Sequence, residues 1–329
     1  MNPIARFLHE LAASGALDLP RPGGGATPER HHALLELARV HPVSVARLVE
    51  AHTDAVAIRA EGGYASDPRL LYGVWASETA EPGPPVIDRT RQTITGVKQF
   101  CSGLGVVDRA LVTAIDDGGH RVLVEVDVTA APTIRWTTEA WTSPALVDAS
   151  TGTITFDAHP VSADATVGTP RWYLERPGFW HGACGPAACW AGAAVGLVDV
   201  AEGLVDSNPH RVAELGGMRT AVWVLRALVD RAGREIDDDP TDAAGTARWR
   251  ALALRHAVER TCSEVLDRFS QALGPRPFTS DRATAQRYAD THLYLRQHKG
   301  SVDLHELGAS SSSGATPAPA QSAELHLRR

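Results

Sequence analysis

The chain has 329 residues and a mass of 35.1 kDa, enough for one large domain or roughly two to three small ones with their own cores. Its 43% hydrophobic and 22% charged residues, with 29 Gly and 21 Pro, exclude a fibrous or wholly disordered chain. The net charge of -7 lacks the electrostatic footprint of a nucleic-acid binder, so we expect no nucleic-acid partner.

The sequence shows no targeting or anchoring pattern. Its beginning has no long apolar core behind a basic start, so it does not read as a signal peptide. The most apolar run, 187–198, is followed by Asp199 and Glu202 and is too short to span a bilayer. Four irregularly spaced cysteines fit neither a disulfide framework nor a zinc pattern. We therefore expect a cytoplasmic protein with no membrane partner and no bound metal.

The first third of the chain has helical periodicity. The Pro/Gly stretch 20–25, the pair His41-Pro42 and the glycines after Glu61 interrupt it. The segments with apolar residues at helical spacing are 3–13, 29–40 and 43–60. These segments predict an N-terminal helical domain over residues 1–69.

From about residue 70 the apolar pattern becomes alternating. A polar glycine turn, 116–120, separates two β-rich runs in this part of the chain. The strand-like segments are 93–100, 109–115, 121–128 and 151–156. We predict a middle antiparallel β domain over residues 70–165.

After Pro177 helical periodicity returns. The segments that carry it are about 183–205, 212–236, 249–273 and 281–299, the number needed for a four-helix bundle. We predict a C-terminal bundle over 166–308, followed by a disordered tail rich in Ser, Ala and Pro over 309–329. The whole chain is expected to be α+β, with its helices and strands in separate blocks.

The sequence contains none of the motifs GxGxxG, GxxxxGK[ST], HExxH or GxSxG. Three other stretches are informative: LYGVWASE at 71–78, GVKQFCSG at 96–103, and YLERPGFW at 173–180. Together with the order of the helical and β blocks, they resemble the acyl-CoA dehydrogenase superfamily over about residues 30–308. In that family a helical domain, a β domain and a four-helix bundle follow one another.

The resemblance implies a bound FAD whose flavin ring lies against the β domain. Val74, Ala76 and Ser77 match the strand that binds the ring partly through backbone groups. Phe100 matches an aromatic residue against the ring, and Ser102 matches a hydroxyl beside flavin N5. Hydrogen-bonding groups without bulky charge suit that edge of a flavin.

Two matches lie near the C-terminus. Gln271 and Gly274 correspond to residues that approach the FAD of a neighbouring subunit, which implies a homo- or hetero-oligomer. His298 stands eight residues past Asp290, where the family usually carries its catalytic Glu. Imidazole titrates near neutrality and is able to act as a base. Three possibilities follow: His298 is the base, the protein has no such base, or the base is supplied from elsewhere.

Three functions are compatible with this resemblance. The first is an FAD-dependent oxidoreductase that oxidises the Cα–Cβ bond of an acyl-CoA or other acyl thioester and passes electrons to an acceptor. The second is a flavin-dependent monooxygenase of the same fold, supplied by a flavin reductase, which needs no such base. The third is a degenerate, non-catalytic subunit that pairs with a catalytic homologue. The short N-terminal domain suits this third function, because it lacks about two helices of the family pattern.

Overall fold

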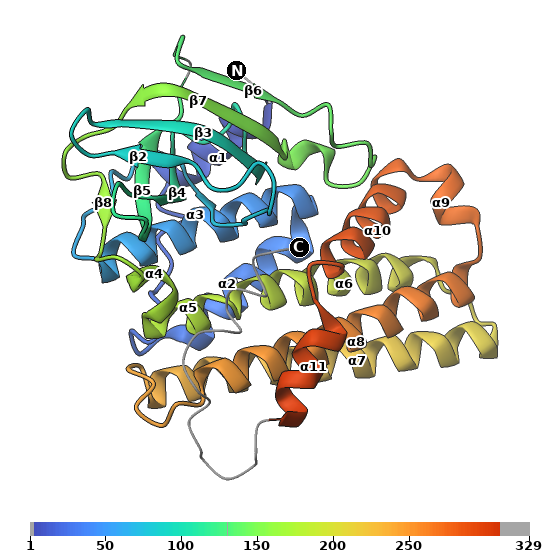
Figure 1. Ribbon diagram of the computed structural model, residues 1–329. Coiled ribbons are helices and arrows are strands. Elements are labelled where there is room, and N and C mark those ends of the chain that lie inside the picture. The colour runs from blue at the N-terminus through green and yellow to red at the C-terminus, as the bar shows by residue number, and fades with distance from the viewer. Residues whose placement is uncertain (1–2, 130, 310–329) are drawn as a thin grey trace.

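The chain folds in the predicted order of helices, strands and helices (Figure 1). The computed structural model describes residues 3–129 and 131–309. The tail predicted from residue 309 onward therefore lies, apart from Ala309, outside the described residues. Three helices open the chain where periodicity predicts them, and they are α1 (Pro3–Ala13), α2 (Thr27–Val40) and α3 (Val43–Glu61).

The β domain is one eight-stranded sheet with the strand order β6-β7-β3-β2-β4-β5-β8 and with β1 beside β4. Its strands are β1 (Tyr72–Trp75), β2 (Val86–Asp88), β3 (Thr93–Cys101), β4 (Arg109–Ile115), β5 (Arg121–Asp127), β6 (Ile134–Thr137), β7 (Gly152–Pro160) and β8 (Thr166–Val167). Most pairs are antiparallel, as predicted, but β1 and β2 each run parallel to β4. Alternation of apolar residues does not reveal strand direction, because side chains alternate in both kinds of pair.

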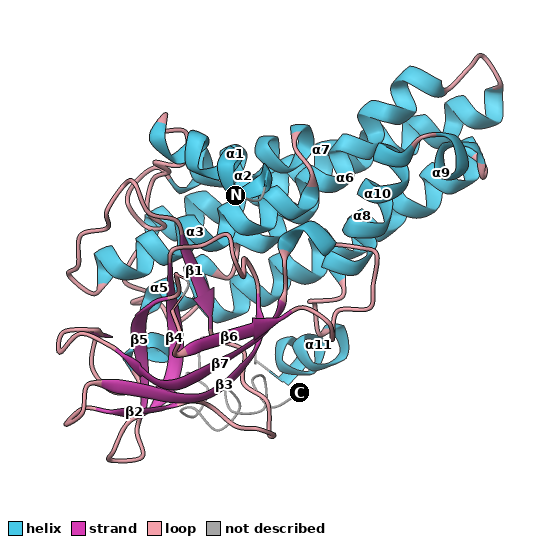
Figure 2. Cartoon of the chain, turned by 90° about the horizontal axis from the view of Figure 1, so that it is seen from above, coloured by secondary structure: helices cyan, strands magenta, loops and turns pink. Residues whose placement is uncertain are grey.

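The C-terminal part contains the four predicted long helices and several short ones. They are α4 (Trp172–Glu175), α5 (Pro177–Gly182), α6 (Gly185–Leu204), α7 (Pro209–Asp238), α8 (Ala247–Leu273), α9 (Arg276–Ser280), α10 (Arg282–Leu295) and α11 (Gly300–Ala309). Seen from above, the long helices lie together and the sheet lies to one side of them, next to α3 (Figure 2).

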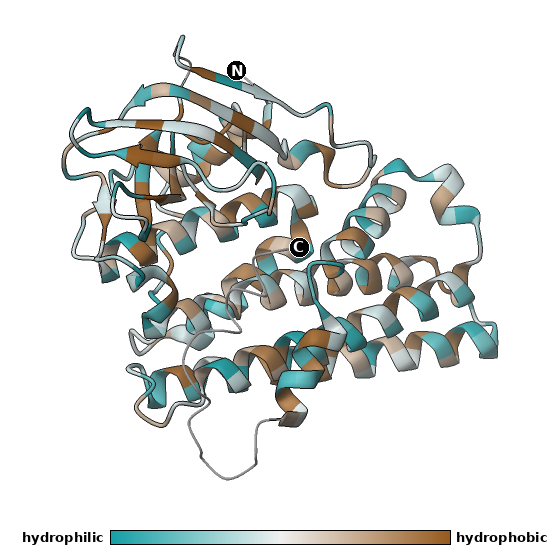
Figure 3. Cartoon of the chain, viewed as in Figure 1, coloured by the Kyte–Doolittle hydropathy of each residue, from teal (hydrophilic) through white to brown (hydrophobic). Residues whose placement is uncertain are grey.

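Helix α6 is the central helix of the bundle. It is apolar along most of its length, except at Asp199 and Glu202 (Figure 3). The stretch Pro177–Leu204 is long and apolar enough to span a membrane, but 78% of its most apolar window is buried inside the fold. This burial is typical of a core helix.

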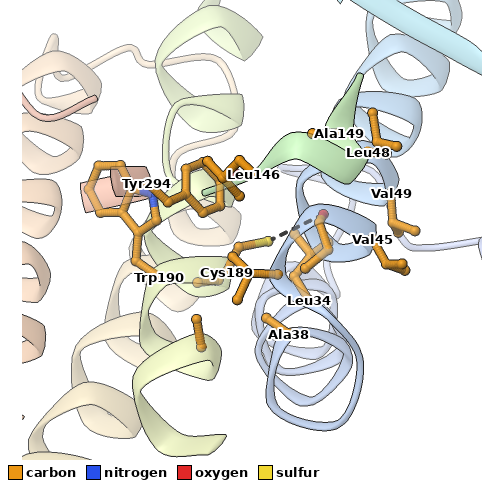
Figure 4. Packing of buried hydrophobic residues seen from close by; sticks show 14 of the residues in the cluster. Leu34, Ala38, Val45, Leu48, Val49, Leu146, Ala149, Cys189, Trp190 and Tyr294 are labelled. Atoms are coloured by element: carbon orange, nitrogen blue, oxygen red, sulfur yellow. Dashed lines mark hydrogen bonds between the residues drawn. The ribbon is translucent and has the colours of Figure 1, made fainter. Parts of the chain in front are cut away.

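Glycines allow α6 to approach α2 closely. A Cβ at Gly192 would clash with the main-chain carbonyl oxygen of Leu35, and one at Gly196 would lie 2.7 Å from that of Arg39. Next to this contact, Cys189 and Trp190 of α6 pack with apolar residues of α2 and α3 and with Tyr294 of α10 (Figure 4). The core therefore joins the N-terminal helices to the bundle.

Candidate functional site

The end of β3 presents the aromatic and hydroxyl groups predicted from the sequence. Phe100 is 55% exposed and has a positive φ of 58°, at an irregularity in the pairing of β3 with β7. A positive φ is uncommon for a residue with a Cβ and often marks a functional position. Ser102 follows two residues later, and its carbonyl oxygen accepts a hydrogen bond from Trp75 Nε1 at 2.9 Å.

The strand-end residues of β1 lie nearby but differ in exposure. Val74 is half-buried and pairs with Leu111 of β4, whereas Ser77 is exposed beyond the end of the strand. The Ala76 carbonyl oxygen accepts a hydrogen bond of 3.4 Å from Thr113 Oγ1. The structure therefore brings Phe100 and Ser102 together at the end of β3, with β1 beside them.

The hydroxyl of Ser102 is linked to helix α3. Arg47 of α3 donates hydrogen bonds to Ser102 Oγ from Nε at 3.2 Å and from Nη2 at 3.0 Å. Thr151 Oγ1 lies 2.9 Å from the same Ser102 oxygen. Arg47 thus connects the end of β3 to the inner side of the N-terminal helices.

Arg47 begins a row of charged residues that we call the α3 polar face: Arg47, Glu50, Asp54 and Glu61. Positions 47, 50, 54 and 61 fall on one side of a helix. This side faces the carboxyl end of α5 and the amino end of α6, where glycines make room for the carboxylates. A Cβ at Gly182 would lie 2.6 Å from Asp54 Oδ1, and one at Gly185 would lie 2.8 Å from Glu50 Oε1.

Burial changes the protonation of this face. Desolvation, followed by the charge of Asp54, raises the pKa of Glu50 to about 8, although Arg30, Arg255 and Arg47 act in the opposite direction. Desolvation also raises the pKa of Asp54. The two carboxyls are one helical turn apart, so they are held by α3 as an interacting pair that retains a proton near neutral pH.

Aromatic and cationic side chains of the bundle lie near the α3 polar face. The Arg255 guanidinium lies over the Trp190 ring at 4.7 Å and donates a hydrogen bond of 3.1 Å to the Ala183 carbonyl oxygen. The Arg47 guanidinium lies 5.4 Å from the centre of the Tyr294 ring. Trp190 and Tyr294 meet edge to face at 6.0 Å. This part of the interior is therefore charged and aromatic, in contrast to the apolar core beside it.

A cavity of about 280 Å³ adjoins the far end of the α3 polar face. Asp54, Glu61, Arg176 and His181 are among its lining residues. Arg176 is buried and pairs with Glu61 at 2.5 Å. The cavity is large enough for a small molecule, and Glu50 lies one helical turn beyond Asp54 toward Ser102.

His298, the base suggested by the sequence, lies in the turn between α10 and α11. Its Nε2 is 3.1 Å from Nδ1 of His256, and its Nδ1 is 3.0 Å from Oδ2 of Asp303. The His298 side chain is 3% exposed. Both ring nitrogens therefore lie against protein groups, and the catalytic role of His298 stays a prediction.

Gln271 and Gly274 lie at the other end of the molecule. Gln271 is exposed in the last turn of α8, and Gly274 follows with a positive φ of 63°. Both views place this turn, next to α9, far from the β-sheet (Figures 1 and 2). Within one chain they do not meet Phe100 and Ser102, so their predicted contact with a flavin requires a neighbouring subunit.

The residues at the end of β3 fit a flavin ring. Phe100 offers an exposed aromatic face, and Ser102 offers a hydroxyl two residues away, at the junction with the charged interior. A flat ring system with one hydrogen-bonding edge needs this combination of groups. Among residues 3–129 and 131–309, no cluster of three or more His, Cys, Asp or Glu side chains is arranged to hold a metal ion.

The succession of a helical domain, a β domain and a helical bundle is the fold of the acyl-CoA dehydrogenase-like flavoproteins. No family model and no curated protein sequence matches this chain. Solved structures do match it. The complex of TdsC from Paenibacillus sp. A11-2 with FMN and indole has a TM-score of 0.75 at 16% identity, covering 97% of this chain and 98% of that one.

Two further structures have the same fold. Methanesulfinate monooxygenase MsuC from Pseudomonas fluorescens matches with a TM-score of 0.73 at 17% identity, over 97% of both chains. Butyryl-CoA dehydrogenase from Megasphaera elsdenii matches with a TM-score of 0.70 at 16% identity, over 85% of this chain and 80% of that one. These likenesses establish the fold that was expected from the order of motifs.

Sequence reasoning missed the α3 polar face. Its signal was present, because positions 47, 50 and 54 carry charges at helical spacing in a segment otherwise rich in apolar residues. Such spacing is equally typical of a face turned to water. Only the tertiary structure shows that this face lies inside the molecule.

Proposed function

We propose that this chain is a flavin-dependent oxidoreductase of the monooxygenase type, acting on a small polar substrate. The flavin ring would lie against Phe100 and Ser102, and the substrate would bind along the α3 polar face. One observation carries this choice: Arg47, which donates hydrogen bonds to Ser102 Oγ, lies on the same buried side of α3 as Glu50 and Asp54, and Asp54 lines the adjoining cavity.

The charged lining favours a polar substrate over an acyl chain. Methylene groups gain free energy by leaving water only where they meet apolar surface, and Glu50 and Asp54 would lose solvation without gaining a hydrogen bond. Oxidation of an acyl thioester is therefore less well supported, although butyryl-CoA dehydrogenase shares the fold. TdsC and MsuC, which match over almost their whole length, support the monooxygenase alternative.

When bound, a flavin supplies two-electron oxidation or, once reduced, the activation of oxygen. The chain's own residues would bind and orient. Phe100 would pack against the ring and the Ser102 hydroxyl would bond to its polar edge, while Arg47 holds that hydroxyl in place. A separate reductase would supply the reduced flavin, which is FMN or FAD. A second subunit would add Gln271 and Gly274.

The test is a titration of the purified chain with FMN and with FAD, followed by quenching of flavin fluorescence. We expect saturable binding of at least one of them. Phe100→Ala should raise Kd about 5-fold, because an aromatic contact contributes about 1 kcal/mol. The matched control is Val86→Ala, an exposed apolar residue of the same sheet, which should leave Kd unchanged. Failure of both flavins to bind would overturn the proposal and favour the non-catalytic subunit.

A further inference from the structure

The carboxyls of Glu50 and Asp54 accept no hydrogen bond from the described part of the protein. Glu50 is 9% exposed, and Asp54 is half-buried beside the cavity. In the described part of the chain no group donates a hydrogen bond to either carboxylate and no ion pair forms with them. Buried carboxylates are normally paired or hydrogen-bonded, so this arrangement is costly unless a ligand supplies the donor.

The nearby arginines are engaged elsewhere. Arg47 bonds to Ser102 Oγ, and Arg255 bonds to the Ala183 carbonyl oxygen and stacks on Trp190. Their positive charges still act on Glu50 through space. A guanidinium has five N–H donors, so both arginines keep donors for a second group. The site therefore combines free acceptors with cations that would stabilise an anion.

We propose that Glu50 is a catalytic proton acceptor for a small substrate with an acidic O–H or N–H group. This inference rests on the function proposed above. In the step, the substrate's O–H or N–H bond breaks and a Glu50 Oε–H bond forms. The negative charge moves from the carboxylate to the substrate atom, where Arg47 and Arg255 stabilise it. The step transfers a proton and no electrons. It leaves the substrate as a nucleophilic anion beside the end of β3.

Several charged and titratable groups face Glu50 from the elements packed around it. They are Arg30 of α2, Arg47 and Asp54 of α3, Tyr173 of α4, Cys189 of α6, Arg255 of α8 and Tyr294 of α10. Burial raises the pKa of Tyr294, Cys189 and Tyr173, so these three stay neutral near pH 7. Glu50, whose pKa is raised to about 8, is therefore the group of this set that exchanges a proton near pH 7.

The raised pKa of Glu50 suits the role. A base removes protons best when its pKa is near the working pH, and a carboxyl with a pKa of about 8 is a far stronger base than an exposed one. Gly185 makes the placement possible, because a side chain there would meet Glu50 Oε1. The carboxyl thus reaches the amino end of α6 from a different domain of the fold.

The test follows the ionisation of Glu50 in the full chain without flavin. Glutamate is labelled with ¹³C at its side-chain carboxyl, and the Glu50 resonance is assigned by its loss in Glu50→Gln. The control Glu10→Gln changes a solvent-exposed residue of α1 and should leave that resonance in place. We expect a titration midpoint of about 8. Asp54→Asn should lower the midpoint, because it removes a neighbouring negative charge.

Phenol and anisole then serve as matched probes. Phenol donates a hydrogen bond that stabilises the carboxylate, so it should lower the Glu50 midpoint by about one pH unit or more. Anisole has a similar shape but no O–H, and should leave the midpoint unchanged. A Glu50 resonance that titrates like exposed glutamate, or equal effects of the two probes, would overturn the inference. Because no flavin is present, a failed flavin titration refutes the proposed function separately.

Discussion

Two positions in α6, one near its middle and one at its amino end, use glycine for different purposes. Near its middle, Gly192 lets the helix lie against the backbone of α2, and the surrounding side chains are apolar. At its amino end, Gly185 leaves room for the Glu50 carboxylate, and the surrounding groups are charged or aromatic. The missing side chain serves packing in one place and chemistry in the other. The two positions should therefore respond differently to the same substitution.

The largest effect on stability is expected at Gly192, where the glycine serves packing. Gly192→Ala places a methyl group against the Leu35 carbonyl oxygen, and the two helix backbones cannot both stay in place. We expect the free energy of unfolding to fall by about 3 kcal/mol. Urea unfolding measures it. The control is Gly203→Ala in the same helix, where a Cβ meets nothing within 4 Å and up to about 1 kcal/mol should be gained.

The packing of α2 against α7 should weaken in acid. Burial lowers the pKa of His31 to about 4, and its Nδ1 lies 2.9 Å from the Val229 carbonyl oxygen of α7. A lowered folded-state pKa gives stability that is complete above about 6.5 and is lost as pH falls through about 4. His31→Gln should therefore flatten the fall in Tm between pH 6.5 and 4. An unchanged slope would show that His31 does not contribute.

The contribution of Glu50 to stability should depend on pH in the opposite direction and should fall as the pH rises. The pKa of Glu50 is raised to about 8, so its contribution is complete below about 4.5 and is lost as pH rises through about 8. Glu50→Gln cannot ionise, and it should be more stable than the wild type at pH 9 by about 1 kcal/mol or more. Tm measured at pH 5 and pH 9 decides this. A wild-type advantage at pH 9 would contradict the assignment.

The smallest effect on stability is expected for Gly185→Ala. Its new methyl group would meet Glu50 Oε1, the mobile end of a side chain, so the free energy of unfolding should change by less than about 1 kcal/mol. The same change should displace the Glu50 carboxyl and shift its titration midpoint. A loss of stability as large as that of Gly192→Ala would show that Gly185 and Gly192 do not differ in the way described.

The fold was largely predictable, because helical and alternating periods report local structure and the order of blocks limits the topology. The helices over 29–40 and 43–60 appear almost at their predicted bounds. The parallel pairing of β1 with β4 was not predictable, since Tyr72 and Arg109 are paired by tertiary structure alone.

The sequence points to candidate site residues only on the β side. Phe100 and Ser102 lie two residues apart in one continuous motif, and their contact with a flavin stays a prediction. Glu50 was not identified, because its importance depends on what faces it: glycines from one helix and arginines from others. A charge on a helix gives the same sequence signal in water as in the interior. The sequence position that points to His298 as a base therefore gives no indication of a carboxyl in another domain.

The most direct test of this account is a crystal structure of the chain soaked with FMN. We expect difference density for the flavin ring against Phe100. The polar edge of the ring should lie near Ser102, with the α3 polar face on the opposite side of the ring. Ordered flavin bound elsewhere, or none at saturating FMN, would contradict it.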